Sequence, residues 1–184
     1  MKLRIIIVSM VLFFSFFTYF YIQGSQYLNK KSFADTYATG GIDLDKLELI
    51  LFNEGLNPSE INLMSRKFFY DENFNFTIKT LERFIELYPS QVNSETYSVL
   101  AESFYELDKT FSNEVLNYID KSLYIDPSNT KALSLKGLFF FEKNSFNEAL
   151  QTWAIALDNS KDNKEKESLI IAMNLALKKL ENKK

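Results

Sequence analysis

The sequence contains no cysteine and no histidine among its 184 residues. Their absence excludes disulfide bridges, zinc sites built from cysteine and histidine, histidine-ligated haem, and nucleophiles of the cysteine or serine–histidine kind. The lack of cysteine does not identify a compartment, although an oxidising one would do this chain no harm. We therefore expect no cofactor and no metal site.

Glycine and proline are scarce, with five and three residues, and the formal net charge is only −3. A chain without a basic footprint is not typical of nucleic-acid binding, so nucleic acid is not an expected partner. Hydrophobic residues make up 46% of the chain and aromatic residues 16%, which indicates a packed fold rather than a disordered one.

Charge is missing altogether from residues 5–22, the run IIIVSMVLFFSFFTYFYI, which follows Lys2 and Arg4. This run is long enough to cross a bilayer as a helix, and the preceding positive charge predicts a cytoplasmic N-terminus with an exported body. A cleaved signal peptide is the alternative, but Ile22-Gln23-Gly24 makes a poor cleavage site. We predict an uncleaved transmembrane anchor over residues 1–23 and a polar linker over residues 24–42.

The remaining chain, residues 43–184, carries a pattern in which a small residue is followed at +3 and +4 by two aromatic residues. Self-similarity at a fixed period of this size is typical of helical repeat arrays. The pattern occurs three times with a shift of 36 residues, at Ser65-Phe68-Phe69, Ala101-Phe104-Tyr105 and Gly137-Phe140-Phe141.

Start and stop signals divide each repeat into a first helix, helix A, and a second helix, helix B. Asn57 before Pro58 predicts the N-cap of the first helix A, and a short helix ahead of it covers residues 43–52. Pro89 and Pro127 end the first two B helices. The second repeat carries two extra residues between its helices, within LDKTFSNEV.

The last segment, residues 162–180, has apolar residues at helical spacing and follows the third repeat directly. The stripe consists of Leu169, Met173, Ala176 and Leu180, widened by Ile170 and Leu177. Open arrays need a terminal helix that covers their exposed apolar face. We predict an all-α fold: a tetratricopeptide helical-hairpin array of about three repeats plus a C-terminal capping helix, behind the N-terminal transmembrane helix.

Carboxylates offer little support for catalysis. Glu102 and Glu106 share one helix face, but exposed helices carry such pairs routinely. Asp158 and Asp162 lack the spacing and turn glycine of a calcium loop. Trp153 lies at a helix-B position where packing between helices is the default interpretation. We expect a protein that is not an enzyme.

The concave face of the array is the main candidate site, because helix A lines the groove in folds of this kind. Its second aromatics form an apolar stripe suited to a partner helix, and its cations suit the carboxylate of a bound peptide. Burial of some of these aromatics under a neighbouring helix is an equally weighted alternative. The predicted peptide-binding groove consists of Asn62, Arg66, Phe69, Ser98, Glu102, Tyr105, Lys131, Ser134, Leu138 and Phe141.

The last 90 or so residues resemble the tetratricopeptide domains of bacterial cytochrome c biogenesis, the NrfG and CcmI type. The resemblance rests on ETYSVLAESFYEL, the enlarged turn, YIDKSLYIDPSN and TKALSLKGLFFFEKNSFNEALQTWAIAL. Lys136 departs from it, because the generic repeat prefers an apolar residue there. The resemblance implies an inner-membrane-anchored periplasmic adaptor that binds the C-terminal region of apocytochrome c and presents it to haem lyase subunits.

Two other functions fit the same sequence. One is a general periplasmic chaperone or scaffold of the envelope or export machinery, which would recognise different clients. The other is an accessory structural subunit of a membrane complex, whose groove would be filled by its own assembly. Client preference separates the first from the adaptor, and constitutive occupation of the groove identifies the second.

Overall fold

Each helix pair begins at an asparagine, and the three asparagines, Asn57, Asn93 and Asn129, are 36 residues apart. The Oδ1 atom of each accepts a hydrogen bond from the backbone N–H three residues later, at 3.0, 3.0 and 2.9 Å. These bonds satisfy N–H groups that have no partner inside the helix. The predicted N-cap at Asn57, with Pro58 in the first turn, is confirmed.

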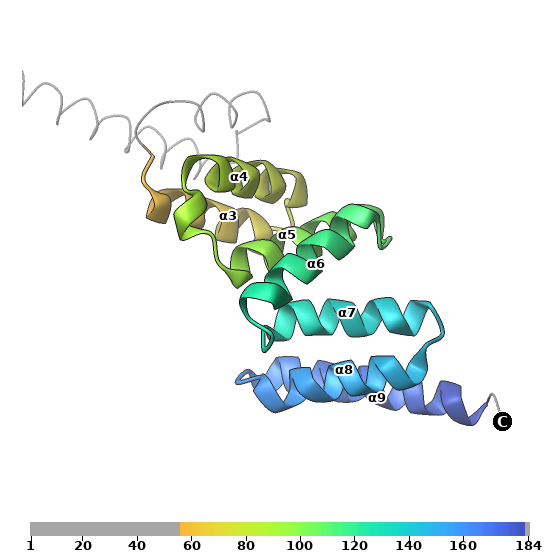
Figure 1. Ribbon diagram of the computed structural model, residues 1–184. Helices are drawn as coiled ribbons and strands as arrows, with labels where there is room; N and C mark the ends of the chain where they lie inside the picture. The colour runs from red at the N-terminus through yellow and green to blue at the C-terminus, as the bar shows by residue number, and fades with distance from the viewer. Residues whose placement is uncertain (1–55, 183–184) are drawn as a thin grey trace, which may run out of the picture. The chain divides into compact units, whose positions relative to one another are not determined.

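The computed structural model describes residues 56–182, and within them the secondary structure is entirely helical (Figure 1). Three antiparallel pairs follow one another and a single helix ends the series. The helices are α3 (Pro58–Tyr70) with α4 (Phe74–Leu87), α5 (Ser94–Asp108) with α6 (Asn113–Ile125), α7 (Thr130–Glu142) with α8 (Phe146–Asn159), and α9 (Asn163–Glu181). A 3-10 helix, η1 (Pro89–Gln91), lies between α4 and α5.

The turns inside the pairs follow the predicted spacing. The first and third turns have the same conformation, with Glu72 and Asn144 in the left-handed region at φ of 57° and 59°. The second turn is longer and has Lys109 in that region at φ of 50°. The two extra residues predicted for the second repeat are therefore confirmed, and they lengthen both α5 and the turn after it.

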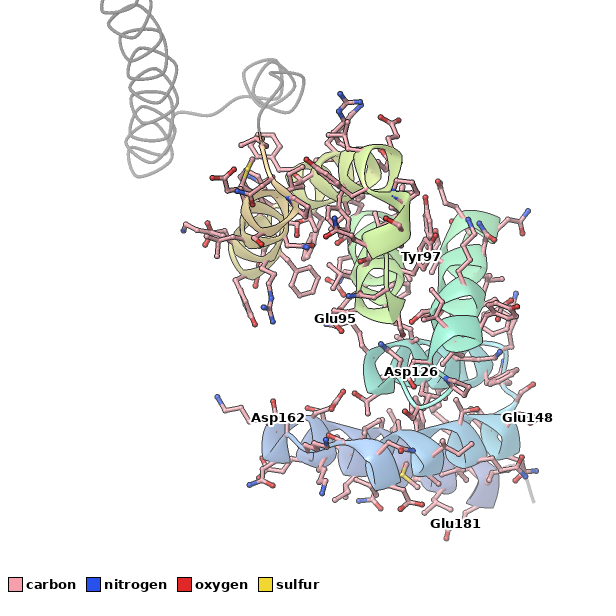
Figure 2. The ribbon with its side chains drawn as sticks, turned by 60° about the vertical axis from the view of Figure 1, so that its left-hand side comes forward. Glu95, Tyr97, Asp126, Glu148, Asp162 and Glu181 are labelled. Atoms are coloured by element: carbon pink, nitrogen blue, oxygen red, sulfur yellow. The ribbon has the colours of Figure 1, made fainter. Side chains whose placement is uncertain are left out.

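Each helix packs mainly against its neighbours in sequence, as expected for an array. Within each pair A lies against B, and each B lies against the next A; α5 also contacts α7 directly. Figure 1 shows α7, α8 and α9 side by side. Asp126, which is labelled in Figure 2, lies in the turn that joins α6 to α7.

The small residue of the repeated pattern lies where helix A meets helix B. Ser65, Ala101 and Gly137 are all buried. In the third pair Gly137 lies directly beneath the indole of Trp153, which is itself 3% exposed. Core packing of Trp153, predicted from the sequence, is thus confirmed.

The predicted C-terminal helix forms and packs against α8, but its apolar stripe is narrower than expected. Leu169 and Ala176 are buried, and Met173 packs against the same core cluster. Ile170 and Leu177 were expected to widen this stripe, whereas they are 46% and 47% exposed. They lie to one side of the stripe, because each is one residue on from a buried position and so turned by about 100° around the helix axis.

Several sequence predictions fall on residues outside the described range. These are the transmembrane anchor at residues 1–23, the linker at residues 24–42 and the short helix at residues 43–52, which stay predictions. Among the residues that the structure does describe, no helix is long and apolar enough to cross a membrane.

Candidate functional site

The second aromatic of each repeat packs against an aromatic residue close to where helix B begins: the first residue of α4 or α8 in the outer pairs, and a residue of the turn before α6 in the middle pair. The ring centroids are 5.9 Å apart for Phe69 and Phe74, and 5.3 Å apart for Phe141 and Phe146. The corresponding contact of the middle pair joins Tyr105 to Phe111 at 4.6 Å.

These contacts give the second aromatics a packing role, because each one closes the turn of its own hairpin. All three nevertheless stay only partly buried. One side of each ring therefore packs within the fold while some of its surface faces solvent. The predicted role of these rings in a peptide-binding groove stays a prediction.

Leu138 and Phe141 pack on the core cluster that contains Trp153. This cluster is shared by α7, α8 and α9, and the ring of Phe141 is 5.9 Å from the Trp153 ring. Ser134 also belongs to this group, because its carbonyl oxygen accepts a hydrogen bond from Trp153 Nε1 at 3.0 Å. These three predicted site residues therefore come from one well-packed region.

Lys131 joins residues from all three hairpins. Its Nζ lies 2.5 Å from Oε2 of Glu102 on α5 and 4.7 Å from the centroid of the Phe69 ring on α3. Both charged side chains are largely enclosed, with 27% of Lys131 and 29% of Glu102 exposed. An ammonium group is attracted to the electron-rich face of an aromatic ring, and the carboxylate adds to that attraction.

Tyr105 is joined to the third hairpin by a hydrogen bond. Its hydroxyl donates to Glu142 Oε1 at 2.9 Å. Partial burial of the phenol, with this bond to a carboxylate, raises the pKa of Tyr105 to about 12. Tyr105 therefore stays neutral, and able to donate, throughout the neutral pH range.

The structure brings most of the predicted residues together, but Ser98 lies beneath the surface. Its side chain is completely buried and donates to the Glu95 carbonyl at 3.1 Å. Its position four residues before Glu102 suggested a shared face, but the short side chain is covered where helices meet. Arg66 is exposed and Asn62 is partly buried.

Lys131 was predicted as a receiver for a peptide carboxylate, but its ammonium is already engaged by Glu102. Sequence reasoning also missed Glu142 and Phe111. Glu142 comes four residues after Leu138, so helical spacing alone would have found it. Phe111 lies in the enlarged turn, whose path the repeat pattern does not define.

The buried polar side chains that the structure describes all have hydrogen-bond partners. Among the described residues, no cluster of carboxylates has the arrangement of a metal site. Lys136, the departure from the generic repeat, is only partly buried and forms an ion pair with Asp120 at 3.2 Å. What remains for binding is a row of half-exposed rings with ionic and hydrogen-bonding groups between them.

No protein-family model and no curated protein sequence matches the chain. Solved structures do match it. The tetratricopeptide domain of Arabidopsis OM64 superposes with a TM-score of 0.54 at 21% identity, covering 66% of this chain and 94% of that one. The chain has the tetratricopeptide fold. The TPR2B domain of yeast Sti1, solved in complex with an Hsp70 peptide, gives a TM-score of 0.52 at 18% identity.

Coverage is similar across these tetratricopeptide structures. The Sti1 match covers 68% of this chain and 97% of that one. The first tetratricopeptide domain of Spaghetti (RPAP3), solved with the HSP90 peptide SRMEEVD, gives a TM-score of 0.51 at 17% identity. That match covers 68% of this chain and 98% of the Spaghetti domain. At these identities the likeness establishes the fold, and the client has to be argued from this chain's own residues.

Proposed function

We propose that this tetratricopeptide chain is an adaptor that binds a helical segment of another protein on the face formed by α3, α5 and α7. We call this surface the helix-A face. The observation that supports the proposal most strongly is the row of partly exposed apolar side chains: Phe69, Tyr105, Leu138 and Phe141. An amphipathic helix docks on such a surface through apolar anchors spaced one turn apart.

Packing of these rings favours binding over a purely structural role. Each second aromatic already packs against another aromatic side chain of its own hairpin, so its exposed side is presented in a fixed orientation. A preorganised surface loses little conformational entropy when a ligand binds. The two peptide complexes among the similar structures, of Sti1 and of Spaghetti, support peptide binding as the general role of the fold.

The client that we propose is the C-terminal region of apocytochrome c, presented to haem lyase subunits. This assignment rests on the resemblance of residues 94–184 to the NrfG and CcmI type of domain. The composition agrees with a holding role, because a chain without histidine or cysteine supplies neither an imidazole to pass on haem nor a thiol to reduce a client disulfide.

The place of action that we propose is the periplasmic side of a bacterial inner membrane. The support is the uncharged run at residues 5–22, with Lys2 and Arg4 ahead of it. An anchored adaptor would meet its client where the client emerges from export, and the anchor would raise the local concentration of both partners.

Fluorescence anisotropy with labelled peptides tests the proposed client. The purified full-length chain is titrated against a peptide of the last 20 or so residues of an apocytochrome c and against a scrambled peptide of equal composition. We expect saturable binding of the first peptide, and at least tenfold weaker binding of the scrambled one. Unlabelled folded holocytochrome should not compete.

Each departure from this result has a definite meaning. Equal affinity for the client peptide and for unrelated amphipathic peptides would replace the adaptor by a general chaperone. Failure of every peptide to bind would reject the proposal, and co-purification with a stoichiometric subunit would instead identify an accessory component of a complex.

A further inference from the structure

The contact between Lys131, Glu102 and Phe69 has the composition of a binding site for a cation. A carboxylate at 2.5 Å and an aromatic face at 4.7 Å surround one ammonium group, and they come from α5 and α3, while the ammonium comes from α7. Carboxylate and ring together recognise Lys or Arg side chains wherever these meet a folded surface. Here the cation between the carboxylate and the ring is Lys131 of the same chain.

We propose that Glu102 and Phe69 form a cation subsite of the helix-A face, which Lys131 fills when no client is bound. A lysine or arginine of the client helix takes the place of Lys131 when the client binds. The proposal rests on the proposed peptide binding, and it adds a class of client residue that the apolar row alone does not specify.

Lys131 is suited to leaving this subsite. It lies in the first turn of α7, which begins at Thr130, and its four-carbon side chain moves freely once its end group is released. The pair is partly open to solvent, with 27% of Lys131 and 29% of Glu102 exposed. Water therefore reaches both charged groups and can solvate them while one ammonium replaces the other, and the exchange keeps one cation beside the carboxylate throughout.

The surroundings favour a cation over an anion at this point. Glu102 is the carboxylate that contacts Lys131, and Tyr105 directs its hydroxyl to a second carboxylate, Glu142, further along the same face. If Lys131 left without replacement, Glu102 would keep its negative charge beside the Phe69 ring. A client cation restores the lost attraction, whereas a client carboxylate would be repelled.

Replacement of Lys131 by alanine vacates the subsite and allows a direct test. The probes are two synthetic amphipathic helical peptides that are identical except that lysines beside the apolar stripe in one are norleucines in the other. The control variant is Lys136→Ala, which removes another lysine of the same helix, one that forms an ion pair with Asp120 on α6 at 3.2 Å.

Because the client ammonium no longer competes with Lys131, we expect Lys131→Ala to bind the lysine peptide about 5- to 30-fold more tightly than the unmodified chain. Binding of the norleucine peptide should change less than about twofold, and Lys136→Ala should leave both affinities unchanged. Adding Glu102→Gln to Lys131→Ala should abolish the gain. Weaker binding of the lysine peptide by Lys131→Ala, or an equal gain for both peptides, would overturn the proposal.

A second measurement does not depend on peptide binding. n-Butylammonium, which reproduces the end of a lysine side chain, is titrated into each variant while the NMR signals of the Phe69 ring are followed. Saturable shifts are expected in Lys131→Ala, and none in the unmodified chain or in Lys131→Ala/Glu102→Gln. Absence of saturation in Lys131→Ala would refute the subsite. If peptides fail to bind while butylammonium saturates, the proposed function is wrong and the subsite stands.

Discussion

A methyl group placed on the Cα of Gly137 would come within 2.3 Å of Nε1 and 2.4 Å of Cδ1 in the indole of Trp153. The two residues therefore define how closely α7 approaches α8. Nε1 is fixed by its hydrogen bond to the Ser134 carbonyl, so the ring has no free direction in which to move. The equivalent positions of the other hairpins, Ser65 and Ala101, carry a Cβ, and Ala101 packs in one core cluster with Val115 and Ile119 of helix B, which are smaller than tryptophan.

Gly137→Ala should destabilise the chain despite the better helix propensity of alanine. The propensity gain is at most about 1 kcal/mol, whereas overpacking a rigid core costs about 1–3 kcal/mol or more. Urea unfolding followed by Trp153 fluorescence measures the change, since this is the sole tryptophan of the chain. In a Trp153→Leu background, where unfolding is followed by circular dichroism, Gly137→Ala should lower the free energy of unfolding much less. Equal costs in both backgrounds would show that the indole is not the obstacle.

Phe141→Ala should lower the free energy of unfolding by about 1–3 kcal/mol, because the ring contacts both Phe146 and Trp153. The cost is below that of a fully buried phenylalanine, since part of the ring faces solvent. Leu63→Ala on α3, where the leucine is 71% exposed, should change stability by less than about 0.5 kcal/mol. Urea midpoints of the two variants measure the difference, and similar midpoints would contradict the packing described for the second aromatics.

The Tyr105 phenol should be among the last tyrosines to ionise on alkaline titration, with its pKa at about 12. Because the folded-state pKa lies above the ordinary value near 10, the stability contributed by Tyr105 is full below pH 10. This stability contribution decreases as the pH rises from about 10 towards 12. Glu142→Gln should lower the pKa of Tyr105 only part of the way to its ordinary value, because burial is the larger cause of the raised pKa. Ultraviolet difference spectra, compared with those of Tyr105→Phe, identify the step, and a step below pH 10 would contradict the assignment.

Asn129→Ala should lower the free energy of unfolding by about 0.5–2 kcal/mol, because it removes the side-chain cap of α7. Asn129→Ser, which can still cap the helix, should keep most of the stability. Thermal unfolding followed by circular dichroism distinguishes the two variants. Equal losses would mean that packing of Asn129, which is 9% exposed, outweighs its capping bond.

The fold was predictable because its determinants are local. Asparagine caps, prolines and the small-x-x-aromatic-aromatic pattern all act within one or two helical turns, so they define helix pairs without knowledge of their neighbours. The position of Trp153 in the core follows equally from its place in helix B. The enlarged second turn was also predictable, because the second repeat has two more residues between its helices than the other repeats.

The site was only partly predictable, because it depends on contacts between hairpins. Nothing local in the sequence says that Lys131 reaches Phe69, 62 residues earlier, or that Tyr105 donates to Glu142. The burial of Ser98 was not predictable for a related reason: helical spacing gives the direction of a side chain but not the depth at which a neighbouring helix covers it. The outward turn of Ile170 and Leu177 shows the same limit for α9.

Paired substitutions on the two sides of the third hairpin test whether the client binds on the helix-A face. Leu138→Gln alters this face on α7, and Ile155→Gln makes the same change on α8, where the isoleucine is 49% exposed. Circular dichroism establishes that both variants keep their helices, and anisotropy then gives their affinity for the apocytochrome c peptide. We expect at least a fivefold loss of affinity for Leu138→Gln and no change of affinity for Ile155→Gln. Equal affinities, or a loss confined to Ile155→Gln, would contradict binding on the helix-A face.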